Sequence, residues 1–270
     1  QALPFWALGP QWFLCQLLAM NVLAAALHHY APALTDRLGQ LAATACDHPV
    51  RFVAGVAVIS AIVYVPLALI YTPWAWTNYG PFSFQTSRPL HYLVYFFAGY
   101  AVGAYGLERG LLASEGALAR RWAWWLVAAV VGFFLWAGPT SLTLDGRQAP
   151  LIVHIASSLG FVVGCAAGTF FFLALCLRFA TGRHWVLDSL SAQAYNMYLN
   201  HYIFVVWLQY AVLGLGLFAV AKFAIVFCGT FVLSWAAAVA LGGLSMGAFF
   251  TQAKRWAPAK VGQKQDGPHR

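Results

Sequence analysis

The chain has 270 residues, of which 62% are hydrophobic and 8% are charged, and its formal net charge is +8. Soluble domains carry about 25% charged residues, so the composition excludes a soluble globular protein and indicates a membrane protein. Nucleic acid is excluded as a partner, because with so few charges the positive excess is better explained by membrane topology.

Seven apolar stretches are long enough to cross a bilayer, which takes about 20 residues. In chain order, we predict membrane helices at residues 11–30, 52–71, 89–107, 122–138, 152–177, 194–214 and 219–243. The predicted fold is an all-α, polytopic transmembrane helix bundle of about seven spans. It forms one domain over residues 1–252, followed by a basic, disordered cytoplasmic tail at 253–270.

The orientation of the bundle follows from the loops, because cytoplasmic loops carry an excess of Lys and Arg. Of the 15 Lys and Arg, all but three lie in one alternate set of loops and in the tail. The exceptions are Arg88, Arg147 and Lys222. The pattern predicts an N-terminus outside and a C-terminus in the cytoplasm.

The sixth predicted span is unusually polar for a lipid-facing helix. At about 100° per residue, Gln193, Asn196 and Asn200 share one face, His201 lies beside them, and Tyr198 falls in a second polar sector. Such residues can hold helices together by hydrogen bonds, but an ionisable residue near mid-membrane usually marks a pathway or reaction site. We interpret His201 as a catalytic candidate and the other four as substrate-binding candidates.

A second candidate site lies in the stretch "SFQTSRPLHY". Pro89 is predicted to begin a helix and Ser87 to cap it, which places Arg88 and His91 at the helix's outer end. Guanidinium offers fixed bidentate donors, so this pair suits an anionic or oxyanion-forming group. The alternative is an interfacial Arg that reaches to water.

His154 lies outward near the start of the fifth predicted span and is a weaker substrate-binding candidate, with a hydrogen-bonded interface histidine as the alternative. No His, Cys or carboxylate pair has metal-ligand spacing within a span, so no metal site is predicted. All 7 acidic residues lie in loops or at ends, which disfavours ion-coupled transport.

Three segments in order resemble the acyltransferase 3 family of integral-membrane acyltransferases. The segments are "GPQWFLCQLLAMNVLAAAL", "GPFSFQTSRPLHY" and "LSAQAYNMYLNHYIFVVWLQY", the last with a Ser-x-x-x-Tyr-x-x-Tyr-Leu-x-His pattern. Together they span essentially the whole chain. Cys15 and Gln16 stand where the resemblance leads us to expect an acidic residue.

The resemblance implies a ten-helix protein of the bacterial inner membrane that moves acetyl, succinyl or similar groups onto extracytoplasmic carbohydrates, as in the O-acetylation of polysaccharides. We expect the last seven helices here. The family's Arg and His of the first helix would then precede residue 1, and activity would require them.

The implied reaction takes an acyl group from cytoplasmic acyl-CoA to a sugar hydroxyl outside, with no bound cofactor. Expected partners are the lipid bilayer, the donor and the carbohydrate acceptor; a periplasmic partner would be unidentified. Acyl transfer needs a base and donors for the developing oxyanion. The catalytic candidates are His201, His91 and Arg88.

Basic residues of the inner loops are candidates for binding the donor's phosphates, although the positive-inside bias explains them equally well. They are Arg120, Arg121, Arg178 and Arg183. Two other functions stay open from the sequence. One is an exporter of polysaccharides or small molecules, and the other is a membrane scaffold.

Overall fold

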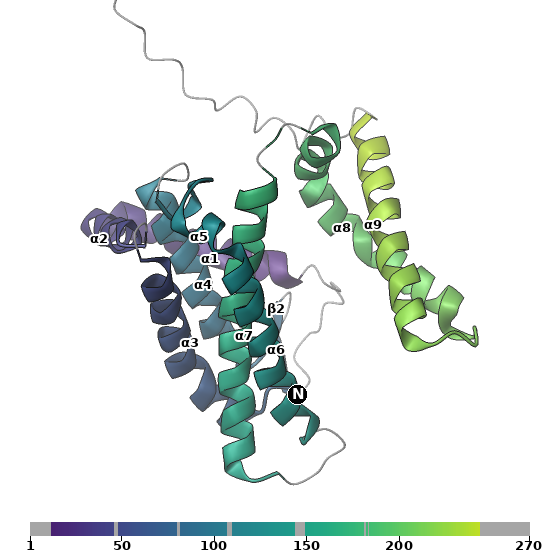
Figure 1. Ribbon diagram of the computed structural model, residues 1–270, viewed down its shortest axis with the longest axis horizontal. Coiled ribbons are helices and arrows are strands. Elements are labelled where there is room, and N and C mark those ends of the chain that lie inside the picture. Colours follow the sequence, from purple (N-terminus) through teal and green to yellow (C-terminus); the bar gives the residue numbers. More distant parts are fainter. Residues whose placement is uncertain are drawn as a thin grey trace, which may run out of the picture. The chain divides into compact units, whose positions relative to one another are not determined.

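The computed structural model describes residues 12–45, 48–79, 82–106, 110–143, 149–180, 182 and 184–243. These ranges are almost entirely helical (Figure 1). The helices are α1 (Trp12–Tyr30), α2 (Pro32–Ala43), α3 (Pro49–Tyr71), α4 (Pro89–Tyr105), η2 (Gly110–Leu112), α5 (Ala117–Arg120), α6 (Trp122–Ser141), α7 (Leu151–Phe179), α8 (Trp185–Leu213) and α9 (Ala219–Gly243). The strands are β1 (Trp76–Tyr79) and β2 (Phe82–Gln85).

Five helices in the described ranges are long and apolar enough to cross a membrane, namely α1, α3, α6, α7 and the Ala219–Leu241 part of α9. The other two predicted spans are also helical, but α4 has 17 residues and the polar residues of α8 lower its mean hydropathy. The chain is therefore an all-α, multi-pass membrane protein, as predicted. The predicted tail from residue 253 lies outside the described residues.

The chain forms two compact units, Gln1–Gly182 and Arg183–Arg270. In the first unit, α6 and α7 lie side by side along most of their length (Figure 1). Glycines make this possible, because a Cβ on Gly160 would meet the Leu135 carbonyl oxygen at 2.2 Å and one on Gly132 would meet Gly164 Cα at 2.8 Å. Small residues at such spacings let membrane helices approach closely.

Helix α2 corrects the prediction of a loop after the first span. Pro32 begins the helix, where its missing N–H costs nothing. The buried side, with Thr35 and Gly39, packs on α4, and Thr35 Oγ1 lies 3.0 Å from the Tyr100 hydroxyl. At 12 residues the helix is too short to cross the bilayer, which is why a search for spans misses it.

A β-hairpin between α3 and α4 was not predicted either. Its strands are antiparallel, with Trp76 opposite Gln85 and Tyr79 opposite Phe82. Thr77 and Thr86 join their hydroxyls at 2.8 Å at the open end of the hairpin, beside Trp76 and Gln85. The hairpin returns the chain to the bundle directly before Arg88 and so fixes where α4 begins.

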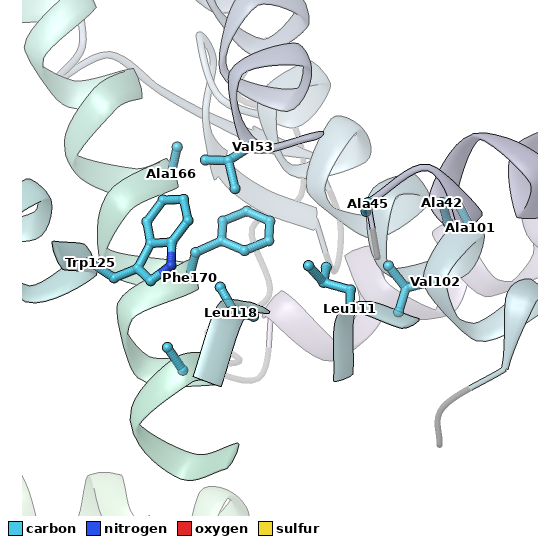
Figure 2. Packing of buried hydrophobic residues seen from close by; sticks show 11 residues of the cluster. Ala42, Ala45, Val53, Ala101, Val102, Leu111, Leu118, Trp125, Ala166 and Phe170 are labelled. Carbon is cyan, nitrogen blue, oxygen red and sulfur yellow. The ribbon is translucent and has the colours of Figure 1, made fainter. Parts of the chain in front are cut away.

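The apolar core of the first unit lies at its predicted cytoplasmic end. Figure 2 shows Trp125 next to Phe170, with Leu118 and Val53 beside them. The centroids of the Trp125 and Phe170 rings are 6.0 Å apart. This packing joins α3, α5, α6 and α7 at one end. The opposite ends of α3, α6 and α7 are left to enclose a cavity.

The second unit is a hairpin of α8 and α9. Helix α8 begins at Trp185 rather than at residue 194, because its polar first turns are helical too. Trp235 Nε1 donates to Ser189 Oγ at 3.0 Å, and a Cβ on Gly229 would lie 2.8 Å from Leu208. These contacts hold the two helices close along the hairpin.

Candidate functional site

A cavity of about 340 Å³ lies where the end of α3, the start of α4, the end of α6 and the start of α7 meet. By the loop-charge prediction, this end of the first unit faces outside. Its wall combines aromatic rings, hydroxyl groups and two basic side chains. The lining residues that matter here are Tyr64, Thr72, Trp74, Arg88, Trp136, Thr140, His154, Ser157, Ser158 and Phe161.

Arg88 supplies the cavity's positive charge. Its guanidinium carbon lies 4.9 Å from the ring centroid of Phe161, in a cation–π contact, and the guanidinium also interacts with the Tyr64 hydroxyl. The Nε atom is buried and has no hydrogen-bond partner among the described residues. None of the described lining residues is Asp or Glu, so the described wall gives this cation no acidic partner.

Arg88 also corrects the predicted cap of α4. The helix begins at Pro89, as predicted, which makes Arg88 the N-cap and leaves Ser87 one position too early to cap. The Ser87 hydroxyl is buried and has no partner in the described part of the chain. The first N–H groups of α4 therefore receive no side-chain cap.

The start of α4 lies deep within the bundle rather than at the membrane face. Helix α3 continues from Tyr64 to Tyr71, seven residues or about 10 Å at 1.5 Å per residue. Helix α7 begins at Leu151, ten residues or about 15 Å before Phe161. Because Arg88 contacts both Tyr64 and Phe161, it lies well inside the ends of these helices, where it lines the cavity.

His91 is packed behind the cavity wall and is 3% exposed. Its Nδ1 lies 2.5 Å from Ser60 Oγ, and its ring lies 5.5 Å from Tyr64 and 5.2 Å from Phe161 between ring centroids. Because a hydroxyl can donate or accept, the tautomer of His91 is not fixed by this contact. The His91 ring packs against Tyr64 and Phe161, which are the two aromatic residues that Arg88 contacts.

His154 lines the same cavity as Arg88, although the two are far apart in the sequence. It lies on the first turn of α7, and Ser157, nearly one turn later, joins its hydroxyl to Thr140 of α6 at 2.7 Å. That hydrogen bond fixes the α6–α7 wall beside the imidazole. Two of the predicted site residues are thus brought together here, and His91 lies directly behind them.

Thr72, at the rim, has a backbone conformation that L residues rarely adopt, with φ 62° and ψ 153°. Pro73 follows it and favours such an extended ψ. A positive φ of this kind costs about 1–3 kcal/mol and persists only where the surroundings enforce it, commonly at functional sites. Here it turns the chain sharply from α3 toward Trp74, another residue of the cavity wall.

The second unit carries a separate groove of about 560 Å³ between α8 and α9. Tyr198, His201 and Gln209 line it from α8, and Thr230 and Ser234 line it from α9. The hydroxyls of Thr230 and Ser234 are buried and have no partner among the described residues. The groove is therefore largely apolar, with a few polar side chains and with no Asp, Glu, Lys or Arg among its described lining residues.

The hydrogen bond of His201 defines its chemistry. Its Nδ1 lies 2.6 Å from the Tyr198 carbonyl oxygen. Because a carbonyl can only accept, Nδ1 carries the hydrogen, and Nε2 of the neutral ring is an acceptor. For the neutral ring, this contact therefore selects the tautomer whose Nε2 can accept a proton.

Amide side chains of α8 make hydrogen bonds within the second unit. Asn196 Nδ2 donates to Gln193 Oε1 at 2.9 Å, and Asn200 Nδ2 donates to the Ser234 carbonyl at 3.3 Å. None of these three amides is among the described residues that line the groove, whereas Tyr198 and His201 are. Their predicted role in substrate binding stays a prediction, and joining α8 to α9 is the role that the contacts show for Asn200.

The family model of the acyltransferase 3 family, described as an acyltransferase domain, matches residues 1–239. The chain belongs to this family. It is a membrane acyltransferase. No curated protein and no solved structure matched the chain.

In this acyltransferase, the predicted donor-binding arginines gather at the end of the first unit opposite the cavity. The Trp122 and Phe179 rings contact at 5.2 Å, so the start of α6 meets the end of α7. Arg120, Arg121 and Arg178 are exposed there, and Arg183 lies outside the described residues. Their role toward the donor stays a prediction.

The sequence reading missed most of the acyltransferase cavity wall. Tyr64, Trp136 and Phe161 lie within apolar runs, where aromatic residues carry no signal of their own. The adjacent Ser157 and Ser158 inside a span were a usable signal, because hydroxyls within a membrane helix need partners. The Gly160-x-x-x-Gly164 spacing likewise indicated a close helix contact.

Proposed function

We propose that this acyltransferase moves an acyl group, acetyl or similar, from cytoplasmic acyl-CoA to a carbohydrate hydroxyl on the outer side of a bacterial inner membrane. The observation that supports this most is the cavity at the predicted outer end of the first unit. It offers a half-buried cation, paired hydroxyls and an aromatic wall in a volume of about 340 Å³. Small-molecule sites of about 300–1,000 Å³ are typically built in this way.

Each polar group has a proposed role in the transfer. Arg88 orients the acceptor or stabilises the oxyanion that forms at the acyl carbon, since no described residue of the wall is acidic and the guanidinium keeps its positive charge for the ligand. His154 contacts the acceptor from the opposite wall. His91 is a positioning residue that acts through Tyr64 and Phe161, because it does not line the cavity.

Transfer to a hydroxyl also requires removal of its proton. Within this chain we propose His201 as a proton relay in the groove of the second unit, through the Nε2 atom of its neutral ring. In the balanced reaction, the acceptor oxygen forms a bond to the acyl carbon while the thioester C–S bond breaks. The proton passes from the hydroxyl through the base to the leaving thiolate, which departs as free coenzyme A.

The donor would approach from the cytoplasmic end, where Arg120, Arg121 and Arg178 offer positive charge to its phosphates. A neutral acyl group then needs to cross only part of the bilayer, because the cavity extends about 10 Å or more inward from the outer helix ends. In this proposal the acyl group crosses the membrane and the glycan stays outside. An exporter would instead move the glycan itself across the membrane.

The test uses the full-length protein in sealed liposomes with the cavity end inside. Acetyl-CoA labelled in the acetyl group is added outside, and a glycan acceptor is enclosed. We expect alkali-labile label on the enclosed glycan, with free coenzyme A outside. Release of unlabelled glycan to the outside, with no new ester, would contradict acyl transfer and identify an exporter.

A further inference from the structure

We propose that the cavity at Arg88 recognises an acidic glycan, and that Arg88 receives a carboxylate of the acceptor. This inference rests on the proposed function, because it specifies the acceptor of the same site. It starts from the charge on Arg88. The described cavity wall holds a guanidinium and no carboxylate, so a neutral ligand would leave that charge unpaired.

The described surroundings of Arg88 do not neutralise its charge. The residue is half-buried, and the groups that its guanidinium meets there are the Tyr64 hydroxyl and the Phe161 ring, neither of which is acidic. The two described acids of the first unit, Asp36 and Glu115, lie on α2 and just before α5, at the other end of that unit. An anion from the ligand is therefore the partner that the described site lacks.

The free edge of Arg88 fits a carboxylate in particular. A carboxylate accepts two parallel hydrogen bonds from a guanidinium, and one such arrangement uses its two terminal nitrogens. Nε has no partner among the described residues but is itself covered, so the terminal nitrogens are the donors that we propose for a ligand in the cavity. The face of the guanidinium is already used by Phe161, which leaves its edge for the ligand.

The rest of the wall suits a sugar ring. Trp74 and Trp136 offer aromatic surface against which the C–H face of a sugar can pack, and His154 and Ser158 offer hydrogen-bonding groups. A carboxylated sugar would thus satisfy all three properties of the cavity at once: its charge, its hydroxyl groups and its apolar surface. A neutral sugar would satisfy the last two only.

A carboxylate could also come from the acyl group, and an anionic oxygen could come from a lipid headgroup. We assign it to the acceptor because the cavity is at the predicted outer end, while the donor enters from the cytoplasm. The experiment separates these sources. It measures binding first, without catalysis, so that it does not depend on an intact reaction.

The full-length protein is placed in nanodiscs of phosphatidylcholine, and binding of methyl glucuronide is compared with that of methyl glucoside by calorimetry. A hydrogen-bonded charge contributes about 1.5–3 kcal/mol, so glucuronide should bind at least about tenfold more tightly. Arg88→Gln should abolish the difference, and Arg88→Lys should keep a reduced one. Arg37→Gln, at an exposed arginine of α2 outside the cavity, should keep it in full.

Equal binding of the two sugars by the wild type, or a preference that survives in a folded Arg88→Gln protein, would overturn the proposal. Suppression of glucuronide binding in phosphatidylglycerol nanodiscs would identify a lipid headgroup as the occupant and overturn it too. So would glucuronide binding that appears only in Asp145→Asn, since a carboxylate of the chain would then hold Arg88. Asp145 lies outside the described residues. Thermal unfolding of each variant confirms that it is folded.

A kinetic comparison separates this inference from the proposed function. The initial rate of acetyl transfer is measured with an acidic and a neutral oligosaccharide, and succinyl-CoA replaces acetyl-CoA in a third reaction. Preference for the acidic acceptor supports the inference. Equal transfer to both acceptors, or an Arg88 dependence seen only with succinyl-CoA, overturns it while the acyltransferase function stands. Transfer to neither acceptor contradicts the proposed function itself.

Discussion

The cavity of the first unit and the groove of the α8–α9 hairpin place polar groups among apolar helices in opposite ways. The cavity contains a cation whose Nε has no described partner, whereas the groove contains no charged side chain among its described lining residues. In the groove, His201 is fixed by a hydrogen bond to its own helix. From this comparison we propose separate roles for the two regions, with the cavity receiving a charged group and His201 in the groove accepting a proton.

The two histidines sharpen this contrast. His91 is buried beside Ser60, and either of its nitrogens can carry the hydrogen. His201 lines a groove, and its Nδ1 must carry the hydrogen. Four substitutions test whether the two regions have these separate roles.

The largest effect is expected for His201→Ala. Loss of a general base lowers the rate by about 10²–10⁴-fold, while glucuronide binding at Arg88 should be unchanged. The measurement is the initial rate of acyl transfer per amount of membrane-inserted protein. His184→Ala, at an exposed position directly before α8, is the matched control and should keep its rate. A folded His201→Ala protein with a rate within twofold of the wild type would show that His201 has a packing role and takes no part in proton transfer.

Gly160→Leu should disrupt the cavity without touching the groove. The new side chain would begin 2.2 Å from the Leu135 carbonyl, so α6 and α7 must separate. Overpacking of this kind costs about 1–3 kcal/mol or more. We expect a lower midpoint of thermal unfolding and loss of glucuronide binding. Gly168→Leu, on the same helix with open space around it, is the control, and equal effects of the two changes would contradict the described α6–α7 contact.

Ser60→Ala removes the partner of His91 Nδ1. A buried group left without its hydrogen bond costs about 1–3 kcal/mol, and the ring beneath Tyr64 and Phe161 becomes free to shift. We expect weaker glucuronide binding together with lower stability, and rescue of both by Ser60→Thr. If Ser60→Ala lowered stability but left glucuronide affinity intact, His91 would have no positioning role toward Arg88.

The smallest effect is expected for Thr140→Val, which removes the hydrogen bond to Ser157. Such bonds between membrane helices average about 0.6 kcal/mol. A double-mutant cycle with Ser157→Ala, read by unfolding in detergent, isolates the coupling between the two hydroxyls. A coupling energy near zero would show that the α6–α7 wall does not depend on this bond.

Long apolar runs predicted most of the fold, because a bilayer requires continuous helices of known length. They could not predict elements that do not cross the bilayer. Helix α2 is short and amphipathic, and the hairpin of β1 and β2 lies in a segment rich in turn residues. The start of α8 was placed too late, because the sequence of Asp188 and Ser189 is typical of a loop although both residues lie in the first two turns of the helix.

The sites were predictable only in part, for a physical reason. A single helix shows which of its residues share a face, so the polar character of α8 was visible from spacing alone. The meeting of Arg88 with His154 was not, because it depends on how α4 and α7 pack. The depth of Arg88 was also hidden, since Pro89 shows where the helix begins but not how far inside the bundle.

The central claim is that the cavity at Arg88 holds the acceptor during acyl transfer. The most direct test is the dependence of acetyl transfer on acceptor concentration in the full-length wild type, Arg88→Gln and Arg37→Gln. We predict that Arg88→Gln lowers kcat/KM for the acceptor by at least about tenfold, whereas Arg37→Gln leaves it unchanged. A folded Arg88→Gln protein with wild-type kcat/KM for every acceptor tried would contradict the claim.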